Sequence, residues 1–205
     1  MIALIDYGAG NVRSVHKALE AVGADVRLTH TASDILSAEK VVLPGVGAFG
    51  DCMAGLRRAG LVQAILQAVG TGKPFLGICV GMQVLFEKGQ EMGLHAGLGI
   101  LPGRVIRFDE ALPAQGLKIP HTGWNQIEPV GKNPLFDNLP PGAWAYFNHA
   151  YYCQTEPEFT LAVTDYGGPF PSMVGRSRVW GIQFHPEKSQ RVGLHILKNF
   201  VEAIK

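Results

Sequence analysis

The sequence predicts an α/β fold with a mostly parallel sheet, helices on both faces and a β-rich C-terminal half. Up to about Gly97, short apolar runs alternate with segments whose apolar residues recur every three or four positions. That alternation is typical of buried parallel strands connected by helices. After Gly97, glycine and proline become frequent and β-rich segments dominate, which indicates mixed or antiparallel strands.

The first half divides into strands and helices in order. Residues 2–5 are a continuous apolar run that predicts a buried strand, and the sequence Asp-Tyr-Gly-Ala-Gly ends it with a turn. A helix follows, which Asn11 can cap and which Gly23 can end in a left-handed conformation. The remaining elements are strands over residues 25–29, 40–43 and 74–78, and a helical stretch over 52–69 with a break near Gly60.

The second half contains five β-rich segments, which are residues 105–108, 124–129, 144–153, 159–165 and 179–184. Residues 189–204 predict a final helix, because their apolar side chains share one face. These side chains are Val192, Ile196, Leu197, Phe200, Val201 and Ile204. The sequence shows no repeat, low-complexity tract or linker, so we expect a single domain over residues 1–205.

Charge and cysteine content exclude some classes of function. The 18 Lys and Arg residues nearly balance the 17 Asp and Glu residues, and no basic run occurs, so we expect neither nucleic acid nor an anionic membrane as a partner. The N-terminus lacks a signal-peptide pattern, and no apolar run is long enough to span a membrane. Three cysteines without disulfide-like spacing predict reduced thiols and therefore the cytoplasm.

The most informative motif is Gly-x-Cys-x-Gly, in which Cys79 lies between a predicted strand and a predicted helix. In a nucleophile elbow, small residues such as Gly77 and Gly81 let neighbouring backbone pack around the reactive side chain. At a helix N-terminus beside an imidazolium, a thiol pKa falls from about 8.5 to roughly 3.5–7.5. The backbone N–H of Val80 would then serve as the first donor of an oxyanion hole. The alternative is that Cys79 is a plain buried thiol.

A second segment supplies a base for such a nucleophile. An apolar run leads to His185-Pro186-Glu187, and the proline favours an extended residue before it. In an extended chain His185 and Glu187 project to the same side, where the carboxylate can orient the imidazole. Because catalytic groups collect at the carboxyl ends of parallel strands, we expect His185 to meet Cys79 and complete a catalytic triad.

A Gly-rich loop over residues 44–50 also follows a predicted strand. It lacks the Gly-Lys-Ser/Thr ending of a phosphate-binding loop, and Arg13 breaks a dinucleotide motif near the N-terminus. We expect the backbone around Val46 and Gly47 to offer the second oxyanion donor, and the peptides of residues 45–47 to be flexible enough to leave the oxyanion hole unformed. No spacing typical of metal ligands occurs, so we expect neither a metal nor a cofactor.

Together these segments resemble the class I, triad-type, glutamine amidotransferases over essentially the whole chain, which implies a flavodoxin-like fold. Within that family, the motifs at residues 6–11, 44–50, 77–83 and 120–125 resemble the branch that serves histidine biosynthesis. That branch comprises the glutaminase subunits of imidazole glycerol phosphate synthase. The His-Pro-Glu-Lys-Ser sequence at residues 185–189 agrees with it.

The resemblance implies that Cys79 attacks the side-chain amide of L-glutamine and that His185, oriented by Glu187, transfers the protons. It also implies which residues bind glutamine, and these are Gln83, Glu91, His149, Ala150 and Tyr151. The family more often has Val-His-Ser where this chain has Asn148-His149-Ala150. Recognition through backbone atoms would tolerate the missing hydroxyl, whereas a direct side-chain bond would not.

The resemblance further implies a partner, because the chain has no second domain that consumes ammonia. In the family this partner is a (βα)8-barrel cyclase subunit, which forms a heterodimer with the glutaminase and receives ammonia through a protected channel. Asn11, Trp124 and Lys188 match positions at that subunit interface. We therefore expect a glutaminase that is nearly inactive alone and is activated by its partner.

Three alternatives stay open at this point. The chain can be a glutaminase subunit of another synthase, such as that for pyridoxal phosphate or anthranilate. It can be a non-catalytic module that retains the fold. It can also be a cysteine peptidase, which would require an open cleft that admits peptides.

Overall fold

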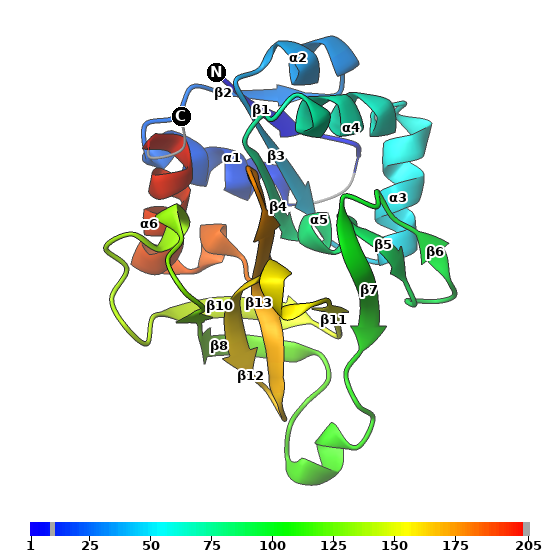
Figure 1. Ribbon diagram of the computed structural model, residues 1–205, viewed down its shortest axis with the longest axis vertical. Helices are drawn as coiled ribbons and strands as arrows, with labels where there is room; N and C mark the ends of the chain where they lie inside the picture. The colour runs from blue at the N-terminus through cyan, green and yellow to red at the C-terminus, as the bar shows by residue number, and fades with distance from the viewer. Residues whose placement is uncertain (9–10, 203–205) are drawn as a thin grey trace.

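The structure is a computed structural model that describes residues 1–8 and 11–202 (Figure 1). Its main sheet has the strand order β2-β1-β3-β4-β14-β13-β12-β9. Five neighbouring strands run parallel, which are β2 (Val26–Thr29), β1 (Ile2–Ile5), β3 (Lys40–Gly45), β4 (Phe75–Cys79) and β14 (Val179–Ile182). The other three continue the sheet in antiparallel fashion, which are β13 (Pro169–Arg176), β12 (Thr160–Asp165) and β9 (Glu128–Pro129).

Helices cover both faces of this sheet, as the sequence predicts. One face carries α1 (Val12–Ala21) and α6 (Gln190–Glu202), which pack on each other. The opposite face carries α3 (Phe49–Arg58) and α4 (Val62–Gly70), and α2 (Ala32–Ser37) packs against α4. The expected break between the two central helices is confirmed at Gly60, whose φ is +68°. No described helix combines the length and the apolar content needed to cross a membrane.

Burial explains why the central strands read as continuous apolar runs. Every residue of β1, β4 and β14 is buried, because helices cover both sides of these strands. Strand β2 lies at the sheet edge and is mostly exposed or half-buried. The position of a strand within the sheet therefore determines its sequence pattern.

Two smaller sheets complete the fold, and one of them includes two strands that lie before Gly97. Strands β8 (His121–Gln126) and β10 (Trp144–His149) pair antiparallel. The other sheet has the order β11-β7-β5-β6, with β11 (Tyr151–Gln154), β7 (Leu101–Arg107), β5 (Phe86–Gly89) and β6 (His95–Ala96). The β-rich segment expected over residues 144–153 is confirmed, but it forms two strands, because the chain leaves one sheet and enters the other at Ala150.

Some helix ends differ from the expectation. The Asn11 side chain makes no capping hydrogen bond to α1, because its amide instead reaches Glu187. Helix α2 is not predicted, although Thr31 caps it by accepting a hydrogen bond from the Asp34 N–H. The expected participation of Ile204 in the last helix, and of residues 9–10 in the first turn, lies outside the described residues.

The neighbouring strands β4 and β14 position the site. They pair in parallel with Gly77 opposite Gly181 and Ile78 opposite Ile182. Both chain segments therefore leave the sheet at the same edge, one just after residue 79 and the other just after residue 182. Short apolar strands far apart in the sequence thus bring Cys79 and the His-Pro-Glu segment together.

Candidate active site

Cys79 occupies a strained turn at the end of β4. Its backbone has φ 54° and ψ −112°, which non-glycine residues rarely adopt and which costs about 1–3 kcal/mol. Pairing of β4 with β3 on one side and β14 on the other holds the turn, and Gly45 lies opposite Cys79 in the register. The predicted nucleophile elbow is therefore present, with the thiol at the carboxyl edge of the sheet.

Three glycines let backbone pack against this turn. A Cβ on Gly77 would collide with the carbonyl of Gly81, and a Cβ on Gly81 would collide with the carbonyl of Leu43. A Cβ on Gly45 would lie 2.5 Å from the Gly81 nitrogen. The loop that the sequence predicts to be flexible is thus tightly packed at Gly45, whereas Gly47 has a positive φ and open space around it.

We expect Gly81→Ala to destabilise the protein by at least about 1–3 kcal/mol, because the added methyl group overpacks rigid backbone on β3. Urea unfolding measures the effect. Gly70→Ala at the end of α4 is the matched control, since a Cβ there meets nothing within 4 Å. Equal stability of the two variants would contradict the packing of the elbow.

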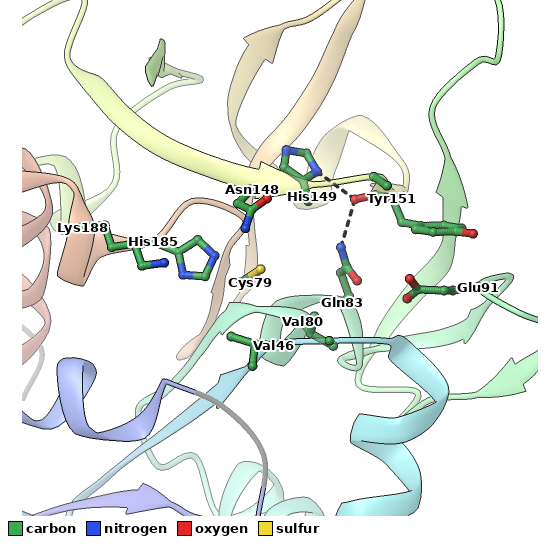
Figure 2. Close-up of a pocket in the computed structure, with 12 residues that line it drawn as sticks. Val46, Cys79, Val80, Gln83, Glu91, Asn148, His149, Tyr151, His185 and Lys188 are labelled. Atoms are coloured by element: carbon green, nitrogen blue, oxygen red, sulfur yellow. Dashed lines mark hydrogen bonds between the residues drawn. The ribbon is translucent and has the colours of Figure 1, made fainter. Parts of the chain in front are cut away.

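The helix expected after Cys79 is much shorter than predicted. It is α5 (Val80–Gln83), a single turn of four residues. The macrodipole of one turn is small, so the helix argument for an activated thiolate is wrong. The sulfur instead accepts a hydrogen bond from Gln183 Nε2 at 3.8 Å, and the imidazole of His185 lies beside it (Figure 2).

His185 and Glu187 form a buried pair. The distance from His185 Nδ1 to Glu187 Oε1 is 2.9 Å, and the two side chains are 5% and 1% exposed. Burial lowers the pKa of His185, but hydrogen bonds to Cys79 and Glu187 outweigh it and raise that pKa to about 10. His185 is therefore an imidazolium at neutral pH, which stabilises a neighbouring thiolate.

The backbone of this pair differs from the expected extended form. His185 itself is extended, but Pro186–Lys188 form a 3₁₀ turn that Ser189 closes by donating a hydrogen bond from Oγ to the His185 carbonyl. Proline favours the first position of such a turn. The carboxylate also accepts a hydrogen bond from Asn11 Nδ2 at 3.4 Å, so the N-terminal segment contacts the pair from behind.

A cavity of about 120 Å³ opens over the Cys79 sulfur. It is lined by Val46, Gly47, Cys79, Val80, Gln83, Glu91, Asn148, His149, Ala150, Tyr151, His185 and Lys188. Every predicted catalytic, oxyanion-hole and substrate-binding residue is among them except Glu187, which lies behind His185. Lys188, predicted at a subunit interface, also reaches the cavity (Figure 2).

The arrangement of nucleophile, base and small cavity agrees with the comparison to known families. A family model described as glutamine amidotransferase class-I matches residues 3–204. The chain belongs to this family.

Close relatives within the amidotransferase family share half of the sequence. The imidazole glycerol phosphate synthase subunit HisH of Desulfitobacterium hafniense is 51% identical over 201 residues, which are 98% of this chain and 93% of the relative. HisH of Syntrophotalea carbinolica is 52% identical over 203 residues, which are 98% of each chain.

Solved structures of more distant proteins show the same fold. PurLQS of Thermotoga maritima has a TM-score of 0.77 and 19% identity, and the match covers 100% of this chain and 98% of that one. The crystal structure of another glutamine amidotransferase has a TM-score of 0.75 and 18% identity, over 98% of this chain and 99% of that one. The predicted fold is therefore confirmed.

Two residues that the resemblance assigns to glutamine binding also make contacts within the protein. Gln83 is buried, and its Nε2 donates to the Tyr151 carbonyl at 3.0 Å and to Gln183 Oε1 at 3.1 Å. Glu91 Oε2 accepts a hydrogen bond from the Phe49 N–H at 2.8 Å, at the start of α3. Spacing alone would have placed both on a helix surface, but Gln83 faces inward and Glu91 lies in a turn after β5.

Two buried histidines lie in contact next to the cavity. His121 Nδ1 and His149 Nε2 are 3.1 Å apart, and His149 Nδ1 lies 2.8 Å from the Tyr151 carbonyl. Burial lowers the pKa of His121 to about 4 and that of His149 to about 3. Both rings are therefore neutral at pH 7.

We expect these two histidines to make the protein sensitive to acid. In the unfolded chain their pKa is near 6.5, so unfolding between about pH 6.5 and 5 takes up two protons, and stability falls by roughly 3 kcal/mol per pH unit at full slope. His185 opposes part of this slope above about pH 5.5, because it stays protonated in the folded protein while its pKa in the unfolded chain is near 6.5. Urea unfolding at several pH values in this range measures the effect. The free energy of unfolding should fall less steeply with decreasing pH in His149→Asn than in the unmodified protein.

The predicted interface residues lie near one another, because Trp124 and Lys188 both contact the Tyr146 ring and Asn11 contacts Glu187, the residue before Lys188. Trp124 is 42% exposed on β8, and Asn11 contacts Glu187 as described above. Lys188 is exposed at the cavity, with its Nζ 5.6 Å from the centre of the Tyr146 ring. Trp124 is therefore free to contact a partner, and Asn11 joins the N-terminal segment to the catalytic pair.

Sequence reasoning missed two polar residues of the site. Gln183 is fully buried between Gln83 and Cys79, and Asn148 lines the cavity. The sequence did contain a signal for Gln183, because it is a polar residue at the end of an apolar strand and lies two residues before His185. Within residues 1–8 and 11–202 no group of three or more His, Cys, Asp or Glu side chains is arranged to hold a metal ion.

Proposed function

We propose that this chain is the glutaminase subunit of an imidazole glycerol phosphate synthase, acting in histidine biosynthesis. The observation that carries the proposal is the Cys79 sulfur on its elbow, beside the His185–Glu187 pair and inside a small cavity. The close HisH relatives support this branch of the amidotransferase family. The small cavity fits a single amino acid better than the peptide of a cysteine peptidase.

The reaction begins when the Cys79 thiolate attacks the side-chain amide carbon of glutamine. A sulfur–carbon bond forms, and the carbonyl electron pair moves to oxygen. The intermediate collapses, the carbon–nitrogen bond breaks, and His185 donates its proton so that ammonia leaves. Neutral His185 then takes a proton from water, which attacks the γ-glutamyl thioester and releases glutamate and the thiolate. Glu187 stabilises the imidazolium in both halves.

The oxyanion of both intermediates needs donors at the carboxyl edge of the sheet. We assign these donors to the backbone N–H groups of Val80 and of Val46 or Gly47, because these residues line the cavity together with Cys79. Gly45 is packed against the elbow, so movement that forms or breaks the hole is confined to Val46 and Gly47. A partner that shifts this short loop would control activity.

Glutamine binding is assigned to the rest of the cavity lining. The Glu91 carboxylate pairs with the α-ammonium group, and Gln83 together with residues 149–151 forms the wall along the substrate. Ala150 and Tyr151 contribute backbone, so the hydroxyl that the family usually carries at Ala150 is dispensable.

The ammonia requires a second subunit. In neutral water ammonia becomes ammonium and loses its nucleophilic lone pair, so we propose delivery through a channel to a (βα)8-barrel cyclase partner in a heterodimer with lyase activity. Asn11, Trp124 and Lys188 form part of the interface. The three cysteines are free and buried thiols, which supports a reducing compartment, the cytoplasm.

Glutamate release with and without a purified cyclase subunit tests this function. We expect activation of at least roughly 100-fold when the cyclase and its nucleotide ligand are present, the size of the effect of one oxyanion-hole donor on kcat. A variant with Trp124→Ala should need more cyclase for half-maximal activation, because an exposed tryptophan is a frequent binding hot spot. High turnover of the pure chain that the cyclase leaves unchanged would contradict the proposal.

A further inference from the structure

Two chains of hydrogen bonds meet at the Tyr151 carbonyl, on the wall of the cavity. From one side the carbonyl accepts from Gln83 Nε2 at 3.0 Å, and from the other side from His149 Nδ1 at 2.8 Å (Figure 2). Gln83 continues to Gln183, whose amide donates to the Cys79 sulfur. Tyr151 is therefore linked both to the nucleophile and to the histidine pair.

The histidine chain has a defined direction. The Asn125 side-chain oxygen accepts from the Gln126 N–H at 2.8 Å, so its amide nitrogen donates to His121 Nε2 at 3.2 Å. A neutral imidazole that accepts at one nitrogen carries its proton on the other. His121 therefore donates from Nδ1 to His149 Nε2, and His149 donates from Nδ1 to Tyr151.

This series of hydrogen bonds lies where the backbone passes from one sheet to another. His121 on β8 lies opposite His149 on β10 in the strand register, whereas Tyr151 begins β11 in the other sheet. Only Ala150 separates the two strands, and its carbonyl accepts from the Phe108 N–H at 3.1 Å. The histidine pair thus ties the two sheets together at the residues that line the cavity.

The surroundings of His121 lock its ring in place. It stacks on Tyr166 with ring centres 3.9 Å apart and on Phe147 at 4.8 Å. His121 does not line the cavity, which its neighbour His149 does. Any influence of His121 on the substrate site must therefore pass through His149.

We propose that His121 and His149 are positioning residues of the glutamine pocket, which hold the Tyr151 carbonyl, and through it Gln83, in the place that glutamine binding requires. The inference rests on the proposed function. This positioning role differs from simple packing of two core histidines, because it requires each imidazole to donate a hydrogen bond from Nδ1. Neither ring transfers a proton or touches the reacting atoms.

Glutaminase kinetics of the complex with the cyclase subunit test the proposal. We expect His121→Leu and His149→Leu each to raise KM for glutamine roughly tenfold while kcat changes little, the size expected for one lost buried hydrogen bond. The double variant should be no worse than either single variant, because the two residues act in one chain. His121→Asn and His149→Asn keep a donor near the Nδ1 position and should restore most of the affinity.

His195→Leu is the matched control, since His195 lies on α6 outside the cavity lining, and the variant removes only its contact with the Asp137 carbonyl and should leave KM unchanged. An unchanged KM in a folded His121→Leu protein, additive effects, or Asn variants as poor as the Leu variants would overturn the proposal. If the wild-type complex releases no glutamate, the proposed function falls and this inference with it.

A spectroscopic test covers the case in which the Leu variants do not fold. Nitrogen-15 NMR of the wild-type imidazoles at pH 7 should show both histidines protonated at Nδ1 and unprotonated at Nε2. An Nε2-protonated tautomer or an imidazolium at either residue would refute the directed chain, whatever the enzyme's activity.

Discussion

Cys79→Ala is expected to abolish glutamate release, by at least roughly 10⁴-fold in kcat, while the complex with the cyclase still uses added ammonium salts. The sulfur is the group that forms the covalent bond, and a methyl group cannot replace it. The smaller side chain should leave the elbow intact, because strand pairing and the backbone packing at Gly77 and Gly81 hold the turn and do not involve the thiol. The assay measures glutamate and cyclase product separately.

Cys52→Ala is the matched control. Cys52 is buried too, but its Sγ contacts the Tyr7 hydroxyl at 3.1 Å and lies away from the cavity lining. Its replacement should cost stability and leave glutamate release nearly unchanged. Loss of both glutamine- and ammonia-dependent activity in Cys79→Ala would show instead that Cys79 is only structural.

Thiol alkylation in the same proteins separates an enzyme from a non-catalytic module with the same fold. Burial raises the pKa of Cys52 to about 12 and raises that of Cys153 well above its usual range. Neither thiol is therefore reactive near neutral pH. Selective modification of Cys79 by iodoacetamide supports catalysis, and equal slow labelling of all three thiols would argue for the module.

Glu187→Gln is expected to lower kcat/KM for glutamine by at least roughly 100-fold, the lower end of what a general acid–base residue contributes. The carboxylate is 1% exposed and accepts from His185 Nδ1, so the amide removes the charge that stabilises the imidazolium. The pKa of His185 then falls from about 10, and the alkaline limb of the kcat/KM profile moves to lower pH. The pH dependence of glutamate release measures both effects.

Asn11→Ala provides a graded comparison for this variant. It removes only the 3.4 Å hydrogen bond to the same carboxylate oxygen and leaves the charge in place, so kcat/KM should fall less and the alkaline limb should move little. An alkaline limb that stays in place in Glu187→Gln would mean that the carboxylate does not set the charge of His185. An effect of Asn11→Ala larger than that of Glu187→Gln would mean that Asn11 does not act mainly through its contact with this carboxylate.

The elements that sequence predicts well are those whose pattern is short and local. The buried strands of the parallel sheet read as apolar runs because both of their faces are covered, and the expected strands and central helices agree with the structure within a few residues. The turn at Cys79 and the His185–Glu187 pair are visible for the same reason, since Gly77, Gly81 and Pro186 lie within two residues of the groups they constrain. The β-rich half was predicted less well. Strand β13 contains two prolines and was not recognised as a strand, and one β-rich segment divides between two sheets at Ala150.

The sequence by itself determined the chemistry of this protein, namely a thiol in a turn that only flanking glycines permit and an imidazole with its own carboxylate. The tertiary structure decided which other side chains serve that chemistry. It directs Asn11 to Glu187 instead of the helix end, brings Lys188 to the cavity, and joins Gln83 to Gln183 across 100 residues of chain. Such contacts depend on strand order and register, as in the pairing of β4 with β14, and no local pattern encodes the distance between two strands that meet only after folding.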